Sequence, residues 1–197
     1  ADSVVFQTYE ESEAFPDSVR EIGTFILNPL APSTPTPYVG LRGKAVCASG
    51  RLTAQKNYPM ALKAFAEFSQ SHPGYTFEVF GTSHAEFDSE SQDSELANLA
   101  SSLGIGDKVV FHGFSGDANE RIRTSAIFVM ASRYEGLSNS MLEALSMGVP
   151  CVCTRCGGGG PEMVIEDGVN GFLVDVDDVE TMAERMGLIV DDEVLSR

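Results

Sequence analysis

The sequence predicts an α/β domain built on a doubly wound parallel sheet and preceded by a short leader. From Lys44 onward, short apolar runs alternate with amphipathic stretches, which is the order of strands and helices in parallel sheets. Several runs are apolar at every position, such as Ala-Ile-Phe-Val-Met-Ala at 126–131, which indicates strands covered on both faces. Ligands of such sheets bind beyond the carboxyl ends of the strands, so the loops that follow the strands should carry the site.

The elements follow in order along two segments. Residues 1–43 form a leader, with strands at 4–7 and 24–27 around a polar stretch, 10–20, and a linker at 28–37 whose prolines exclude regular helix and central strand. Residues 44–197 form the sheet domain. Its expected strands are 45–49, 76–80, 109–111, 127–131, 151–154 and 171–174, and its expected helices are 58–71, 94–103, 119–124, 139–147, 161–166 and 179–190.

Composition limits the partners and the compartment. With 29 acidic and 13 basic residues the net charge is −16, so nucleic acid and an anionic membrane surface are poor partners. No apolar run is long enough to cross a bilayer, and no signal peptide opens the chain. Cysteines without a disulfide pattern fit a cytoplasmic protein. The absence of an initial Met suggests an excised fragment.

Three clustered cysteines, Cys151, Cys153 and Cys156, raise the question of a zinc site. Their spacing is not that of a usual zinc knuckle, and no histidine lies near them in the sequence. Cys151 and Cys153 fall on an expected buried strand, where cysteine packs as a small hydrophobic residue. Burial is therefore favoured over metal binding.

The loop after the first strand of the domain is a candidate diphosphate-binding loop. It contains Gly50, Arg51 and Lys56 directly before a helix. A helix start offers free N–H groups and a partial positive charge, and two cations add charge-assisted hydrogen bonds. The alternative is two solvated surface cations, but in so acidic a chain the phosphate site is favoured.

Two carboxylates flank the start of the expected helix at 139–147. Glu135 precedes the helix and Glu143 lies within it, while the amides of 136–140 form the helix N-terminus. Amides there can bind phosphate while the carboxylates accept hydrogen bonds from sugar hydroxyls. Equally, Glu135 can be an acid placed to suit the helix dipole and Glu143 an exposed helical residue. The spacing alone leaves both interpretations open.

The segment 135–143 resembles the Glu-x7-Glu motif of the retaining group 1, or family 4, glycosyltransferases of GT-B fold. The loop at 50–57, which reads Gly-Arg-Leu-Thr-Ala-Gln-Lys-Asn, is similar to the phosphate-binding loop of that family. Further similar stretches are Val-Val-Phe-His-Gly at 109–113, Gly-Val-Pro at 148–150 and Glu-Asp-Gly-Val-Asn-Gly-Phe-Leu at 166–173. The leader resembles the passage from the first domain to the second, so the resemblance runs from Val4 to about Asp191.

The resemblance implies a Rossmann-like, donor-binding half of such an enzyme, whose partners are a nucleotide-sugar donor and an N-terminal acceptor-binding domain that is missing here. Any membrane contact, peripheral at the inner face, would come through that missing domain. Arg51 and Lys56 would neutralise the diphosphate, and Glu135 would contact the transferred sugar. The implied donor-binding residues are Gly50, Gly136, Leu137, Ser138, Asn139, Glu143 and His112. Of these, Glu143 would bind the ribose hydroxyls. The base would lie against the loop around 111–114, and His112 is the histidine closest to that loop among the three in the chain. Such enzymes need no metal or other cofactor.

Other points stay open. Four glycines at 157–160 precede Pro161, where the family often has one or two, and Glu162 is either a site residue or a helix-start acid. A glycine run favours approach of the backbone to a ligand, or a mobile loop, over packing. A UDP-sugar is favoured as donor because the leader resembles transferases of surface polysaccharide and lipid-linked glycan assembly. A sugar phosphorylase or epimerase of the same fold, or a non-catalytic nucleotide-binding module, are the alternative functions.

Overall fold

The computed structural model describes residues 2–83 and 91–192, and its main body is a parallel sheet of six strands. The strand order is β5-β4-β3-β6-β7-β8. In chain order the strands are β3 Ala45–Ser49, β4 Thr76–Phe80, β5 Val109–Gly113, β6 Ile127–Met130, β7 Cys151–Arg155 and β8 Phe172–Asp175. The chain moves outward from β3 to β5 on one side and then returns to β6 on the other. The neighbours β3 and β6 therefore form the switch point beyond which doubly wound sheets bind their ligands.

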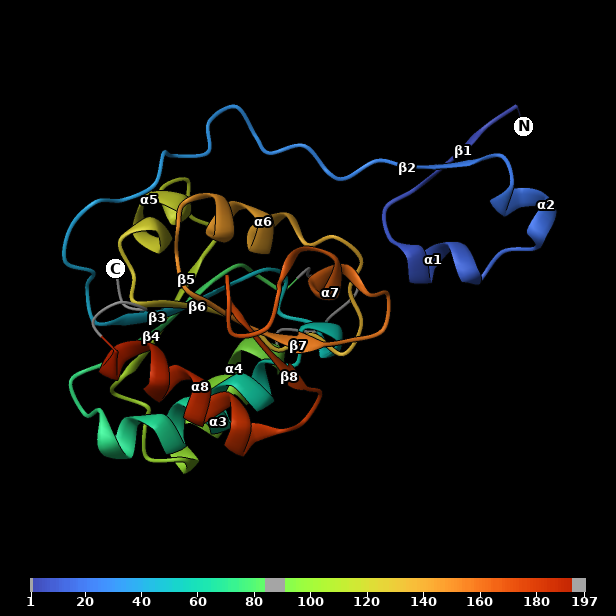
Figure 1. Cartoon of the computed structure of the whole chain (residues 1–197). Helices are drawn as coiled ribbons and strands as arrows, with labels where there is room; N and C mark the ends of the chain where they lie inside the picture. Colours follow the sequence, from blue (N-terminus) through green and yellow to red (C-terminus); the bar gives the residue numbers. More distant parts are fainter. Residues whose placement is uncertain (1, 84–90, 193–197) are drawn as a thin grey trace.

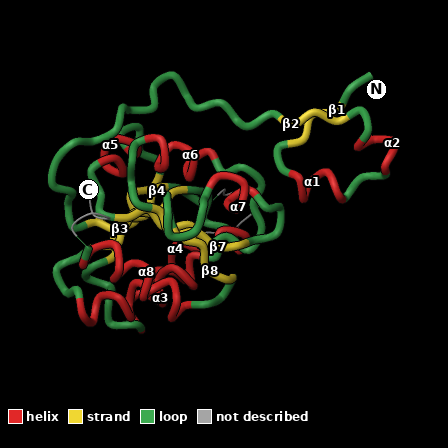
Figure 2. Tube along the Cα trace, viewed as in Figure 1, coloured by secondary structure: helices red, strands yellow, loops and turns green. Residues whose placement is uncertain are grey.

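Helices cover both faces of this sheet (Figures 1 and 2). One face carries α3 Tyr58–Ser71, α4 Ser91–Ser102 and α8 Val179–Asp191. The other face carries α5 Ala118–Arg123, α6 Asn139–Ser146 and α7 Gly160–Val164. The predicted α/β class and doubly wound sheet are confirmed, and the predicted elements of the sheet domain fall within a few residues of the observed ones. The predicted end of that domain, 193–197, lies outside the described residues.

The central strands are apolar throughout because each of their faces packs against a different hydrophobic core. In β3, Val46 and Ala48 belong to the core beneath α3, α4 and α8, while Cys47 between them belongs to the core beneath α5 and α6. Phe128 and Met130 of β6 lie in the same core as Cys47, whereas the residues that alternate with them along the strand lie in the core beneath α3, α4 and α8. Side chains that alternate between two cores remove the polar positions that a half-exposed strand would have.

The leader folds as a small unit beside the sheet (Figure 1). Strands β1 Val4–Phe6 and β2 Gly23–Phe25 pair in parallel, and α1 Tyr9–Glu13 and α2 Asp17–Arg20 connect them. The sequence predicts these strands but not the helices, which fall in a stretch that shows only polar character. The first helix starts where the Thr8 hydroxyl accepts a hydrogen bond from Glu11 N at 3.0 Å, a typical N-cap.

Polar contacts join the leader and linker to the sheet domain. Asn28 Nδ2 donates to the carbonyl oxygen of Leu137 and to Asn139 Oδ1, both at 2.9 Å. Asn28 Oδ1 accepts a hydrogen bond from Gln7 Nε2 at 2.7 Å. One side chain therefore bridges the leader and the start of α6. Within the described ranges, no helix is long and apolar enough to cross a membrane.

Candidate functional site

A pocket of about 510 Å³ lies at the carboxyl ends of β3, β4 and β5. Each of these strands ends in or before a glycine: Gly50, Gly81 and Gly113. At Gly81 a Cβ would lie 2.0 Å from Gly50 O, so only glycine lets the two strand ends come this close. The absence of side chains at these ends leaves the hollow open. Its lining residues are Ser33, Pro35, Ser49, Gly50, Arg51, Phe80, Gly81, Thr82, Gly113, Phe114, Ser115, Gly116, Ala118, Asn119, Glu120 and Glu143.

Two charged side chains in this lining have no partner among the described residues. Glu143, in the middle of α6, is half-buried, and its carboxylate makes no hydrogen bond or ion pair there. Arg51 is exposed at the rim and its guanidinium is similarly unpaired within residues 2–83 and 91–192. Partly buried charged groups usually have a hydrogen-bonding partner, because removing a charged group from water without such a partner costs free energy. An unpaired carboxylate and an unpaired cation in one pocket are therefore well suited to a ligand with hydroxyl and anionic groups.

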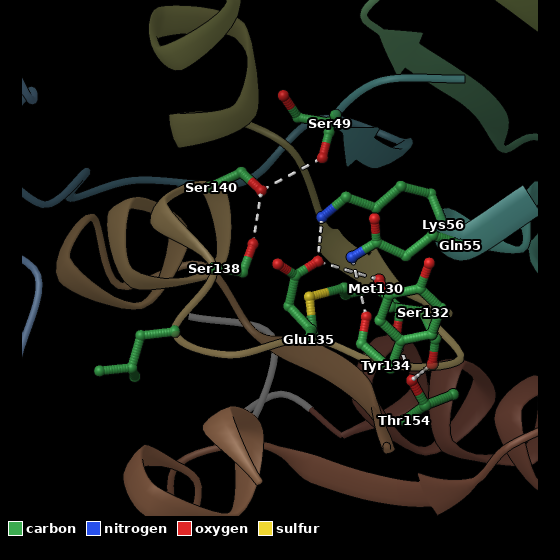
Figure 3. A network of polar contacts seen from close by, with 12 residues as sticks. Ser49, Gln55, Lys56, Met130, Ser132, Tyr134, Glu135, Ser138, Ser140 and Thr154 are labelled. Atoms are coloured by element: carbon green, nitrogen blue, oxygen red, sulfur yellow. Dashed lines mark hydrogen bonds and ion pairs between the residues drawn. The ribbon is translucent and has the colours of Figure 1, made fainter. Parts of the chain in front are cut away.

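Lys56 and Glu135 form an ion pair between the loops that follow β3 and β6 (Figure 3). Only 14% and 16% of the two side chains are exposed, so water screens this pair less than a surface pair. Ser132 Oγ lies 3.5 Å from the same carboxylate oxygen. Neither member of the pair lines the pocket at the ends of β3, β4 and β5. The pair lies beside this pocket. Gly50 lines the pocket, and a Cβ added at Gly50 would be only 3.0 Å from Lys56 Cε.

The two loops are held together by contacts that do not use the pair itself. Gln55 Nε2 donates to the carbonyl oxygen of Tyr134 at 2.9 Å, and Arg133 N donates to the carbonyl oxygen of Gln55 at 2.8 Å. Arg133 also binds both carboxylate oxygens of Asp177, at 2.7 and 3.0 Å, and Asn57 Oδ1 at 3.2 Å. These contacts fix the register between the loops and so determine where Lys56 meets Glu135.

The first turn of α6 is open to a ligand. Its N-cap residue Ser138 makes no side-chain cap, and its hydroxyl lies 3.1 Å from Ser140 Oγ instead. Ser140 Oγ in turn donates to the carbonyl oxygen of Ser49 at 3.1 Å, which ties the helix start to the end of β3 (Figure 3). In the described part of the chain, no acceptor pairs with the backbone N–H of Gly136, Leu137 or Ser138. Unpaired amides at a helix start attract anions.

The glycine run at 157–160 packs against the loop of Glu135, which corrects the expectation that it serves a ligand or moves freely. A Cβ at Gly158 would lie 2.5 Å from Glu135 O, and one at Gly160 would lie 1.8 Å from Gly136 O. Glu135 N donates to the carbonyl oxygen of Gly157 at 2.7 Å. The glycines are needed because two backbones touch here. Glu162 follows in the first turn of α7, exposed, with its pKa raised by desolvation and by the nearby Glu10.

His112 lies outside the pocket lining, with both ring nitrogens occupied. Its Nε2 is 3.1 Å from Glu78 Oε2, and Arg121 Nη1 is 3.3 Å from its Nδ1. Because the guanidinium can only donate, Nδ1 accepts and Nε2–H donates to the carboxylate, which is the neutral tautomer. The ring also stacks on Phe80, with centroids 4.7 Å apart. The geometry therefore gives His112 a supporting place behind Phe80, which does line the pocket.

The cysteines are buried, as the sequence predicted. Cys47, Cys151 and Cys153 lie in the core beneath α5 and α6. Burial raises the pKa of Cys47 and Cys151 to about 12 and that of Cys156 to about 11. Thiols with such pKa values stay protonated at neutral pH and are poor nucleophiles.

The family model of glycosyl transferases group 1 matches residues 41–197. The chain belongs to this family. Over 162 residues it is 33% identical to an exopolysaccharide phosphotransferase of Streptomyces coelicolor, covering 82% of this chain and 16% of that protein. Over 150 residues it is 33% identical to the lipopolysaccharide core biosynthesis glycosyltransferase LpsE of Rhizobium meliloti, covering 76% of this chain and 40% of that protein.

Solved structures show the same fold. The crystal structure of Anabaena HepE in complex with UDP and glucose is similar with a TM-score of 0.86 and 22% identity, over 100% of this chain and 55% of that one. The C-terminal domain of a group 1 family protein from Francisella tularensis is similar with a TM-score of 0.69 and 24% identity, over 82% of this chain and 87% of that one. The parallel six-stranded sheet is thus that of a GT-B glycosyltransferase domain, as the resemblance implied.

In this group 1 domain all the residues expected at the site except His112, which lies behind Phe80, fall into three places. Gly50, Arg51 and Glu143 line the pocket, Lys56 and Glu135 pair beside it, and Gly136 to Asn139 form the turn between. The expectations missed Ser33 and Pro35, which reach the pocket from the linker. No pattern in the sequence indicates where a proline-rich linker runs, so no signal could have placed them there.

Proposed function

We propose that this chain is the donor-binding part of a retaining glycosyltransferase, which takes a sugar from a UDP-sugar and passes it to a glycan or lipid-linked acceptor. The observation that carries the proposal is the unpaired Glu143 carboxylate in a pocket that also contains Gly50 and Arg51, at the carboxyl ends of the strands. Family membership supports transfer over the phosphorylase, epimerase and non-catalytic alternatives. The similar Anabaena structure contains UDP, which supports uracil as the base.

The geometry supports a division of labour along the site. The nucleoside occupies the pocket at the ends of β3, β4 and β5, where Glu143 accepts hydrogen bonds from the ribose hydroxyls. The diphosphate lies between Arg51, Lys56 and the open amides before α6. As the bond between the sugar and the diphosphate breaks, its electron pair leaves with the diphosphate. The two cations and the amides stabilise the charge that develops there, and no metal is needed.

Lys56 and Glu135 change partners in this scheme. In the described structure each neutralises the other. An arriving phosphate competes for Lys56, and Glu135 then becomes available to the hydroxyl groups of the sugar. Only 14% and 16% of the two side chains are exposed, so either charge would be costly to leave unpaired, and the ion pair avoids that cost. The pair keeps both groups in place until the donor arrives.

The second substrate enters through a part that this chain does not contain. The chain spans 16% and 40% of the two curated relatives described above, and 55% of HepE. The leader exposes apolar side chains on β2 and the residues after it, including Phe25, Ile26 and Leu27. We propose that these pack on the N-terminal, acceptor-binding domain. We expect the present chain alone to bind donor and to transfer sugar poorly.

Calorimetric titration with UDP, GDP and ADP tests the proposal. Loss of hydrogen bonds to a charged group costs about 1.5–3 kcal/mol, so Glu143→Ala should raise the Kd for UDP roughly 10- to 150-fold. Glu184→Ala is the matched control, because Glu184 is an exposed glutamate within α8 on the opposite face of the sheet. Lys56→Ala should also weaken binding, and Lys63→Ala on α3 should not.

Three outcomes of related measurements would contradict the proposal. Absence of UDP binding to the unmodified chain would remove its basis, and equal loss in Glu143→Ala and Glu184→Ala would place the nucleotide elsewhere. Loss of UDP binding in EDTA would show that a metal is required. For the intact enzyme, NMR of the anomeric proton should show that the product keeps the configuration of the donor.

A further inference from the structure

The proline-rich linker contributes two residues to the pocket wall. Ser33 and Pro35 line the same hollow as Gly50, Phe114 and Glu143. They come from the segment that connects the leader to the sheet, which Figure 1 shows running past α6 and α5 to the start of β3. A connecting segment has no need to enter a binding pocket.

Contacts at both ends hold residues 28–42, here called the strap, on the sheet domain. At the first end, Asn28 donates to the Leu137 carbonyl and to Asn139. At the other, Arg42 Nη1 donates to the carbonyl oxygens of Arg123 at 2.8 Å and Ser125 at 3.3 Å. These anchors lie on the start of α6 and the end of α5, so the strap between them belongs to the donor-binding half.

The strap is also stiff where it meets the pocket. Four prolines restrict φ within it, at 29, 32, 35 and 37. A turn closes in which Thr34 N donates to the carbonyl oxygen of Ala31 at 2.9 Å, and this turn directly precedes Pro35. A wall that is ordered before the ligand arrives loses little entropy on binding. The strap is therefore suited to contact a ligand and not only to connect two parts.

We propose that the strap forms part of the nucleotide site, with the Ser33 hydroxyl hydrogen-bonding to the nucleoside and the Pro35 ring packing against it. This inference rests on the proposed function, because the ligand is the nucleoside part of the donor. The Ser33 hydroxyl has no partner among the described residues and can both donate and accept. Because Asn28 links the strap to the turn at Leu137, the strap joins the nucleoside end of the site to its sugar end.

Protection from alkylation tests the assignment. In Ser33→Cys the new thiol is exposed, whereas the native cysteines are buried and react slowly. With UDP at about ten times its Kd, roughly one site in eleven is free, so alkylation of the new thiol by a maleimide should slow roughly tenfold. Ser71→Cys, exposed at the end of α3 on the other face of the sheet, is the matched control and should react at an unchanged rate.

Calorimetry separates failure of this inference from failure of the proposed function. If the unmodified chain and Ser33→Cys bind UDP but alkylation is not slowed, the strap does not contact the nucleotide and the inference is overturned. If the unmodified chain does not bind UDP, the proposed function fails first and the inference fails with it. Pro35→Ala should bind UDP more weakly than Pro73→Ala, which removes an exposed proline outside the site. Equal affinities would remove Pro35 from the assignment.

Discussion

Substitution of Gly160 by alanine should unfold this protein at a much lower temperature. The new Cβ would lie 1.8 Å from Gly136 O and 2.4 Å from Gly136 C, whereas real Cβ atoms essentially never approach within 3.0 Å. The backbone must therefore move by about 1.2 Å, the difference between 3.0 and 1.8 Å. Overpacking of this kind costs about 1–3 kcal/mol, and we expect the upper limit because the clash is with backbone. For a chain of this length, about 3 kcal/mol lowers the Tm by roughly 6–12 °C.

Gly157→Ala is the matched control from the same glycine run. Its Cβ would meet Tyr134 Cβ at 3.6 Å, an ordinary contact, and Gly157 is not among the glycines with positive φ. Where the backbone suits alanine, the substitution is neutral or stabilises by about 0.4–1 kcal/mol. Thermal unfolding followed by circular dichroism gives both Tm values. If the two variants melt within about 2 °C of each other, roughly what 1 kcal/mol produces, the packing explanation of the run is wrong.

Three further predictions concern parts away from the pocket. Gly187 lies inside α8, where an added Cβ would meet only His72 Cε1, at 3.6 Å, so Gly187→Ala should raise the stability by about 1 kcal/mol in urea denaturation. Hydrogen bonds from Arg133 and Asn57 lower the pKa of Asp177 from its ordinary 3.8. Their contribution to the free energy of unfolding is therefore present above pH 3.8 and is lost as the pH falls through the lower pKa of the folded state. Asp177→Asn should therefore lower the Tm at neutral pH, with the difference shrinking below pH 3.8; a constant difference would contradict this. With the pKa of Cys47 and Cys151 near 12, a thiol reagent at mildly alkaline pH should label the native chain slowly and all four cysteines after unfolding. Rapid labelling of the native chain would show that the thiols are accessible.

The sheet was predictable because its signals are local. A run such as 126–131 has no polar position, and the helix at 58–71 ends before the His-Pro-Gly sequence that terminates it. The short leader helices were not predictable, since four or five residues are too few to show a helical period. Their start depends on single contacts such as the Thr8 cap.

The candidate site was predictable in its residue types and less so in its contacts. The loops at 50–57 and 135–143 could be found because their residues match a family motif, and the parallel topology places both at the same edge. The partners of His112 could not be predicted, because Glu78 and Arg121 come from other elements of the fold. The packing of Gly160 on Gly136 could not be predicted either, because the sequence does not distinguish a glycine that packs against another backbone from a glycine in a flexible loop.

The position of the Lys56–Glu135 pair at the seam between β3 and β6 has a consequence for folding. The two residues are 79 positions apart, and closing a loop of that length costs about 4 kcal/mol of chain entropy from its length alone. One charge comes from the first half of the sheet and the other from the second, so neither half contains a site by itself. A bound nucleotide should therefore contact both halves of the sheet and hold them together. It would protect both halves from proteolysis together, and the site would be among the last features to form during refolding.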